Sequence, residues 1–229
     1  MSNSTEDDAA SRDLDYVALH ELLTAERMGS YFAESKGDLD GAFQLYEWNM
    51  AVSAAVMHLT GMVEVVVRNA LDKQLQVWAI AQRGRSWLDL APLDGRGKAD
   101  IVKAHERATG FGRFPEVHGK VVAELSLGFW RFLVAKRYLT SLWLPVLAAA
   151  FPAGPADLGE RRRAVEDRLK RLMEVRNRAA HHEPIHRRDL AADVLAAVEI
   201  ASWVHPAARS WVSSRSYVAA LIATRPQFA

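Results

Sequence analysis

The chain has 229 residues, 50% of them hydrophobic, which is enough to bury a sizeable core in one large domain or two small ones. It contains no cysteine, which excludes disulfides, a thiolate nucleophile, an iron–sulfur cluster and a cysteine-based zinc site. A net charge of only +1 argues against a protein that coats nucleic acid by bulk electrostatics.

The charges are distributed unevenly along the chain. Residues 1–40 hold ten acidic and three basic side chains, whereas residues 160–188 hold ten basic and five acidic ones. No apolar run follows a basic start at the N-terminus, so we interpret residues 1–12 as a disordered acidic tail rather than a signal peptide. Residues 13–229 are predicted to form a single helical domain, and the absence of cysteine fits a cytoplasmic location.

Helical periodicity dominates the first part of the chain. Apolar residues recur at spacings of three and four over residues 14–32 and again over residues 38–78. The second stretch predicts one long helix or two stacked helices. Its wide apolar stripe is expected to be core and consists of Leu45, Trp48, Val52, Ala55, Val56, Leu59, Val63, Val66, Val67, Ala70 and Leu71.

The middle of the chain alternates between breaker clusters and apolar stretches. Residues 83–98 and 109–115 contain several glycines and prolines and are predicted to be loops on either side of a short helix. Residues 121–151 are apolar and aromatic, and we expect bends at Gly128 and Pro145. The most apolar part, residues 138–151, is too short and too close to basic side chains for a membrane span, so it is predicted to be buried.

The last part of the chain is again periodic. A helix is predicted over residues 156–182, with Asp157 as its N-cap. Pro184 lacks an amide hydrogen, so this helix should end within a residue or two of His182. Two further helices are predicted over residues 189–204 and 206–223. Since no strand-like alternation longer than four residues occurs, the predicted fold class is all-α.

One cluster of residues has the composition of a catalytic site. Arg176, Asn177, His181 and His182 lie within about two helical turns, roughly 9 Å of axial rise. Cleavage of RNA without a metal needs a base, an acid and a cation, which histidine and arginine supply. The alternative is that the two histidines cap free carbonyls at a helix end. Residues five apart point roughly 140° away from each other, so Arg176 and His181 would meet only through a distorted last turn.

Several further side chains are candidates for binding RNA near this cluster. The basic residues are Arg178, Arg171, Lys170 and Arg68, together with the run of arginines at 161–163, which is either a solvated face or a track for an RNA backbone. Glu64 lies four residues before Arg68, and an intrahelical ion pair between them is the preferred interpretation. The tryptophans could stack on bases, but Trp48, Trp130 and Trp143 lie in apolar stretches and are expected to be core.

A metal site built from His181, His182, Glu183 and His186 is disfavoured. Adjacent histidines rarely bind one ion together, and no HExxH spacing is present. No Gly-rich phosphate loop occurs either. We therefore predict neither a metal nor a cofactor.

The sequence Arg-Asn-Arg-Ala-Ala-His-His-Glu-Pro-Ile at residues 176–185 is similar to the signature of the HEPN superfamily, and resembles its Abi-like version. Four residues separate Arg176 from His181, as in that signature. Residues 45–49 with 63–71, and residues 124–130 with Trp143, resemble the other characteristic stretches of the Abi-like proteins. The resemblance spans roughly residues 45–185.

This resemblance implies an all-α, HEPN-like helical bundle with additional helices. It also implies a homodimer that brings two motifs together around a cleft, and a metal-independent endoribonuclease acting in phage defence by abortive infection. The products would be a 2′,3′-cyclic phosphate and a 5′-hydroxyl. RNA would be the substrate, an antitoxin-like protein is a candidate partner, and no membrane is expected. The resemblance also offers an alternative to the ion pair, in which Glu64 or Arg68 faces the cleft at the site, with Arg68 and Asn69 as candidates to support it.

The resemblance also assigns roles within the cluster. His181 would be the general base or acid, Arg176 would bind the phosphate and stabilise the transition state, and Asn177 would orient one of them. His182 would supply a second proton-transfer group or would hold the helix end. The alternative function is a non-catalytic RNA-binding or protein-interaction module.

Overall fold

A computed structural model describes residues 14–228, in which every regular element is a helix. The predicted all-α class is therefore confirmed. The acidic tail predicted for residues 1–12 lies outside the described residues. The buried apolar side chains form one cluster that extends from Met28 to Val218.

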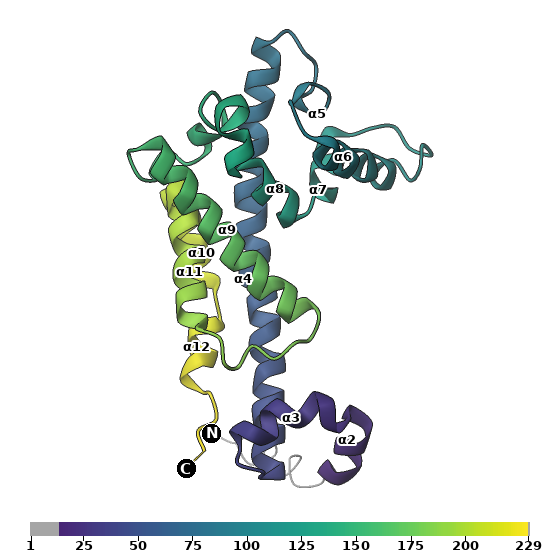
Figure 1. Ribbon diagram of the computed structural model, residues 1–229, viewed down its shortest axis with the longest axis vertical. Helices are drawn as coiled ribbons and strands as arrows, with labels where there is room; N and C mark the ends of the chain where they lie inside the picture. Colours follow the sequence, from purple (N-terminus) through teal and green to yellow (C-terminus); the bar gives the residue numbers. More distant parts are fainter. Residues whose placement is uncertain (1–13, 229) are drawn as a thin grey trace, which may run out of the picture.

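The axis of the molecule is α4 (Leu39–Ala81), a single helix of 43 residues that runs through the length of the structure (Figure 1). It begins where the Asp38 carboxylate accepts a hydrogen bond from the Gly41 amide at 2.8 Å. Every member of the predicted apolar stripe is buried except Val66 and Ala70, which are half-buried. The stripe is therefore core, as predicted.

By length and composition, α4 could also cross a membrane. Half of its most apolar 18-residue window is buried inside the structure, and the core helix of a soluble protein passes the same test. This property alone is weak support for a membrane span.

Two short helices, α2 (Tyr16–Leu23) and α3 (Ala25–Glu34), precede α4. The periodic stretch over residues 14–32 is therefore not one helix, because it is interrupted at Thr24. Thr24 has a φ of 68°, and its hydroxyl accepts a hydrogen bond from the Arg27 amide at 3.5 Å. The threonine therefore caps α3 instead of continuing α2.

Three helices form an arm beside α4: α5 (Trp87–Leu90), α6 (Gly95–Ala108) and α7 (His118–Glu124). The loop predicted over residues 83–98 is wrong at Trp87–Leu90, which form α5, and from Gly95 onward, where α6 begins. The Asp94 carboxylate accepts a hydrogen bond from the Gly97 amide at 2.9 Å and caps this helix. The turn predicted over residues 109–115 is confirmed.

The apolar stretch that follows contains α8 (Leu127–Leu133) and three short helical turns, Lys136–Tyr138, Leu139–Trp143 and Leu147–Ala150. The bend predicted at Gly128 falls instead at Ser126, which caps α8. The bend at Pro145 is confirmed, since this residue lies between the last two turns.

The tryptophans assigned to the core are buried as predicted. Trp48, Trp130 and Trp143 each donate an indole hydrogen bond to a backbone carbonyl, at 2.7, 3.2 and 2.8 Å respectively. Their rings are therefore not available to stack on bases.

The C-terminal helices are α9 (Leu158–Ala180), α10 (Leu190–Val204), α11 (Pro206–Arg215) and α12 (Val218–Ala223). Figure 1 shows α9 crossing in front of α4, while α10 to α12 lie to the left of α4, on the side opposite the arm formed by α5 to α7. Asp157 caps α9 as predicted, with its carboxylate 2.6 Å from the Glu160 amide. The helix predicted over residues 206–223 is interrupted at Ser216 and Tyr217.

Candidate functional site

The predicted motif lies at the C-terminus of α9, which ends at Ala180. The His182 amide donates to the Ala179 carbonyl at 3.1 Å, and the Glu183 amide donates to the Arg178 carbonyl at 2.8 Å. Together with the positive φ of 56° at His182, these bonds form a Schellman motif. The predicted end of the helix is confirmed, and backbone amides rather than the imidazoles cap these carbonyls.

The side chains of the motif differ in burial. Asn177, His181 and His182 are exposed to solvent, whereas Arg176 is half-buried. The Arg176 guanidinium donates to the Asn177 side-chain oxygen at 3.3 Å. The His181 backbone amide donates to the Asn177 carbonyl at 3.0 Å, but among the described residues no side-chain hydrogen bond connects this pair to the His181 imidazole. The structure thus brings Arg176 and Asn177 together, and leaves His181 apart from them.

Arg176 faces α4 and the start of α8, where Glu64 is half-buried. Burial raises the pKa of the Glu64 carboxyl, and the guanidinium groups of Arg176 and Arg68 and the Leu127 amide oppose this rise. No Glu64–Arg68 ion pair within 4.0 Å occurs in the described part of the chain, so the predicted salt bridge is wrong. Glu64 instead attracts two guanidinium groups, one of which belongs to the motif.

The loop after α9 is anchored to the N-terminal half of the structure. The Arg27 guanidinium donates to the His182 carbonyl, and the buried Ile185 amide donates to the Asn49 side-chain oxygen at 2.8 Å. These two bonds connect the loop to α3 and α4. One fixes the backbone at His182, and the other fixes the chain three residues later, at Ile185.

Two of the predicted RNA-binding arginines are engaged within the protein. Arg178 donates to the Pro184 carbonyl at 3.0 Å and lies 3.6 Å from the Glu183 carboxylate. Arg171 donates to the Asp189 carbonyl at 2.9 Å and pairs with the buried Asp193 carboxylate at 2.7 Å. Both contacts weaken the prediction that these guanidinium groups bind RNA.

The remaining predicted RNA-binding residues, Lys170 and Arg68, are less constrained. Lys170 is exposed and makes no hydrogen bond or ion pair within residues 14–228. Arg68 is half-buried near Glu64, and its Nε has no hydrogen-bond partner. Lys170 lies about 120° around α9 from Arg176, so only Arg68 shares a face with the motif.

The arginine run at 161–163 is neither a solvated face nor a free cationic track. Arg162 is only 7% exposed and donates to the Val134 carbonyl at 3.0 Å. Arg161 donates to the Pro155 carbonyl at 2.7 Å. Only Arg163 is exposed, so two of the three guanidinium groups hold neighbouring turns against α9.

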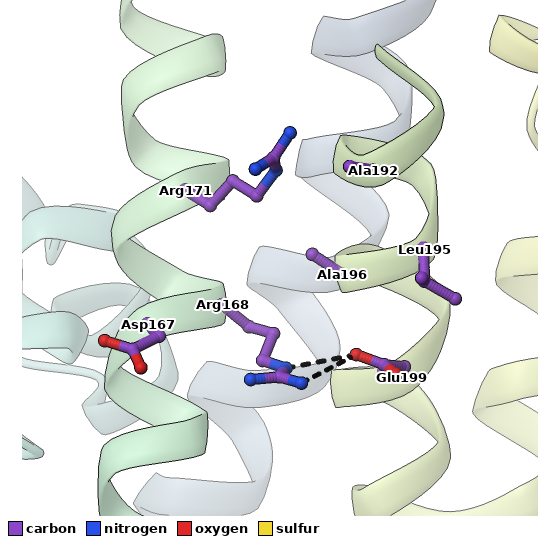
Figure 2. Close-up of a pocket in the computed structure, with 7 residues that line it drawn as sticks. All are labelled: Asp167, Arg168, Arg171, Ala192, Leu195, Ala196 and Glu199. Atoms are coloured by element: carbon purple, nitrogen blue, oxygen red, sulfur yellow. Dashed lines mark hydrogen bonds and ion pairs between the residues drawn. The ribbon is translucent and has the colours of Figure 1, made fainter. Parts of the chain in front are cut away.

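A shallow groove of about 340 Å³ runs between α9 and α10 (Figure 2). It is lined by Asp167, Arg168, Arg171, Ala192, Leu195, Ala196 and Glu199. Figure 2 shows the Arg168 guanidinium bonded to the Glu199 carboxylate across the groove, at 3.1 Å. Both guanidinium groups of the groove are therefore paired, that of Arg171 with Asp193, whereas the Asp167 carboxylate forms no ion pair within residues 14–228. The motif lies outside the groove.

The four side chains considered for a metal do not converge. His186 is only 3% exposed and packs against the Tyr31 ring, whereas His181, His182 and Glu183 point to solvent. In the described part of the chain, no group of three or more histidine or carboxylate side chains could hold an ion. The pKa of His186 is lowered by burial and then by the nearby Arg187.

The sequence reasoning missed Asn49, which anchors the motif loop. A polar residue inside the apolar stripe of a long helix is the signal that points to it, since a buried amide needs a partner. It also underrated Glu64, whose position on the inner side of α4 is visible in the same periodicity.

Comparison of the chain with protein families, with curated proteins and with solved structures found no significant match.

Proposed function

We propose that this chain is a metal-independent endoribonuclease of the HEPN type that acts in the cytoplasm in phage defence by abortive infection. The observation that carries the proposal is the end of α9. There, Arg176 is oriented by Asn177 and Glu64, and the His181 imidazole stands free in solvent one turn later. A cation and a free imidazole are the groups that RNA transesterification requires.

The reaction needs two proton transfers and one site for negative charge. A neutral His181 imidazole takes the proton of the ribose 2′-hydroxyl, and the 2′-oxygen attacks the adjacent phosphorus. The 5′-oxygen leaves with a proton from a second acid, and the products are a 2′,3′-cyclic phosphate and a 5′-hydroxyl. Arg176 stabilises the charge that develops on the phosphoryl oxygens.

The arrangement of the motif favours a site shared by two copies of the chain. Arg176 and His181 lie on different sides of α9, and no bond joins them in one copy. A twofold dimer through the end of α9 would place Arg176 of one copy beside His181 of the partner subunit. The second acid would then be His182 or the second His181. We propose that an antitoxin-like protein inhibits cleavage by covering the cleft between the two copies.

The test is cleavage of labelled total RNA in EDTA, followed by analysis of the fragment ends. We expect cyclic-phosphate ends from the wild type, and a loss of about 10²-fold or more in His181→Ala and in Arg176→Ala. Arg163→Ala removes an exposed cation from the other end of α9 and should cleave normally. Circular dichroism establishes that each variant is folded.

Two results would contradict the nuclease. Unchanged cleavage in His181→Ala would remove that residue from the mechanism. Absence of cleavage by every form, combined with RNA binding, would favour the alternative, a non-catalytic RNA-binding module.

A further inference from the structure

The turn between α6 and α7 carries two exposed aromatic side chains. Phe111 is 77% exposed and Phe114 is 62% exposed, and both lie in the turn that joins the two helices. We name Phe111 and Phe114 the aromatic tip. Neither ring belongs to the cluster of buried apolar residues.

The backbone of the tip is held in an unusual conformation. Gly110, Phe111 and Gly112 have φ values of 57°, 58° and 84° in succession. Glycine adopts such values freely, but a phenylalanine there is strained. Strained backbone conformations of this kind cluster at active sites and ligand-binding sites.

The turn is nevertheless well defined by hydrogen bonds. The Phe111 amide donates to the Glu106 carbonyl at 2.7 Å, and the Phe114 amide donates to the Thr109 carbonyl at 2.9 Å. The Gly112 amide donates to the Thr109 hydroxyl at 3.1 Å. The two rings are thus presented to solvent from a fixed backbone, which reduces the entropy lost when they bind a ligand.

The surroundings of the tip are positively charged. Residues 95–120 contain six arginines and lysines and three acidic residues, a net charge of +3 in a chain whose total is +1. Lys103, Arg113 and Lys120 are exposed and form no ion pair within the described residues. By contrast, Glu116 is paired with His105 at 3.0 Å. These three cations outnumber the two carboxylates of the segment that form no ion pair within the described residues, Asp100 and Glu106, so the unpaired charge of this segment is positive on balance.

We propose that the aromatic tip binds single-stranded RNA by stacking bases on Phe111 and Phe114, while the neighbouring cations contact the phosphates. Flat rings beside free cations match a polyanion with exposed aromatic faces. A base-paired duplex hides those faces and binds more weakly. Figure 1 shows the arm with α6 and α7 projecting from α4 on the same side as the end of α9. The choice of RNA as the ligand rests on the proposed function.

The binding test separates the tip from catalysis. The probe is a fluorescent 12-nucleotide RNA with 2′-O-methyl groups, which has no nucleophilic hydroxyl and therefore cannot be cleaved. Phe111→Gly removes a ring and also relieves the backbone strain, and Phe114→Ala removes the other ring. We expect the Kd to rise about tenfold for each variant, with no loss of thermal stability in Phe111→Gly.

The matched control is Trp211→Ala, which removes an aromatic side chain that is 44% exposed on α11. Its Kd should equal that of the wild type. An unchanged Kd in the Phe111→Gly/Phe114→Ala double variant would overturn the proposal. Tip-dependent sedimentation with phosphatidylserine vesicles, combined with unchanged RNA binding, would also overturn it and identify a lipid surface as the ligand.

The outcomes distinguish this inference from the proposed nuclease. If wild type binds the uncleavable RNA through the tip but never cleaves natural RNA, the inference stands and the nuclease fails. If natural RNA is cleaved while the tip variants bind the probe normally, the nuclease stands and the inference fails.

Discussion

At the scale of single residues, His182 occupies a backbone conformation that glycine usually takes. It is the first residue beyond the cap of α9, with a φ of 56°, and its imidazole is exposed. The Schellman bonds come from the backbone and do not need this side chain. A histidine here costs free energy that packing does not offset, as expected if the imidazole has the function proposed above.

We therefore expect His182→Gly to be more stable than the wild type by about 1 kcal/mol, because glycine tolerates this φ. We also expect its RNA cleavage to be at least about tenfold slower, because a proton-transfer group is lost. Urea unfolding and a cleavage assay measure the two effects. Normal cleavage by this variant would reduce His182 to a residue that merely ends the helix.

His186 should make the stability of the protein depend on pH, because it is buried and neither of its ring nitrogens has a hydrogen-bond partner. Burial is the main cause of its lowered pKa; Arg187 lowers it further, and Glu34 opposes this. The folded state thus binds this proton less tightly than the unfolded state does. The neutral form of His186 therefore contributes to the free energy of unfolding. This contribution is complete above the unfolded pKa of about 6.5 and is lost as the pH falls through the pKa of the folded state.

Replacing His186 by phenylalanine keeps an aromatic ring against Tyr31 and removes the titration. We expect the free energy of unfolding of the wild type to fall more between pH 7.5 and pH 5 than that of His186→Phe. Urea unfolding at the two pH values measures this difference. Equal losses in both proteins would mean that His186 is protonated as readily in the folded state as in the unfolded one.

At the scale of elements, side-chain caps explain both the correct and the incorrect boundaries. Asp38 and Asp157 follow a loop and precede a periodic stretch, so the sequence located the starts of α4 and α9. Thr24, Asp94 and Ser126 also cap helices, but they lie inside an apolar stretch or beside glycines. At Thr24 and Ser126 the apolar periodicity continues through the end of one helix and the start of the next, so the sequence did not show the boundary. After Asp94 the glycines suggested a loop, but a cap can offset the low helix propensity of glycine, and a helix forms.

The candidate site was predictable only in part for a related reason. The residues of the motif are close in sequence, and a short pattern located all of them. The contacts that position them join distant parts of the chain, such as Asn49 to Ile185 and Arg27 to His182. Periodicity shows which side of a helix is buried, but not which segment covers it.

The bond between Asn49 and Ile185 leads to a prediction about the attachment of the motif loop to α4. Asn49→Ala leaves the buried Ile185 amide without an acceptor, which should cost about 1–3 kcal/mol of unfolding free energy. Ser53→Ala is the matched control, since Ser53 lies one turn later on the same side of α4 and its buried hydroxyl has no partner. The control should be neutral or slightly stabilising in urea unfolding. Equal effects in both variants would contradict this role of Asn49.

At the scale of the whole molecule, the position of the motif is the basis for the proposed site shared by two copies. The core gathers along α4, and the end of α9 that carries the motif is at the surface. Arg176 faces inward to Glu64, while His181 extends into solvent. A reaction that needs both side chains at one phosphate would draw them from different copies.

The proposed shared site predicts complementation between the Arg176→Ala and His181→Ala variants. When Arg176→Ala and His181→Ala chains are mixed and allowed to exchange subunits, each heterodimer contains one site with an intact arginine and an intact histidine. Half of the dimers are then heterodimers with one of two sites restored, so about a quarter of the wild-type cleavage should return. Analytical ultracentrifugation of each protein establishes that dimers form. If the mixture is as inactive as its components, a shared site in which His182 is the second acid is wrong: either both His181 imidazoles are needed at one phosphate, or Arg176 and His181 act within one chain and the last turn of α9 rearranges when RNA binds.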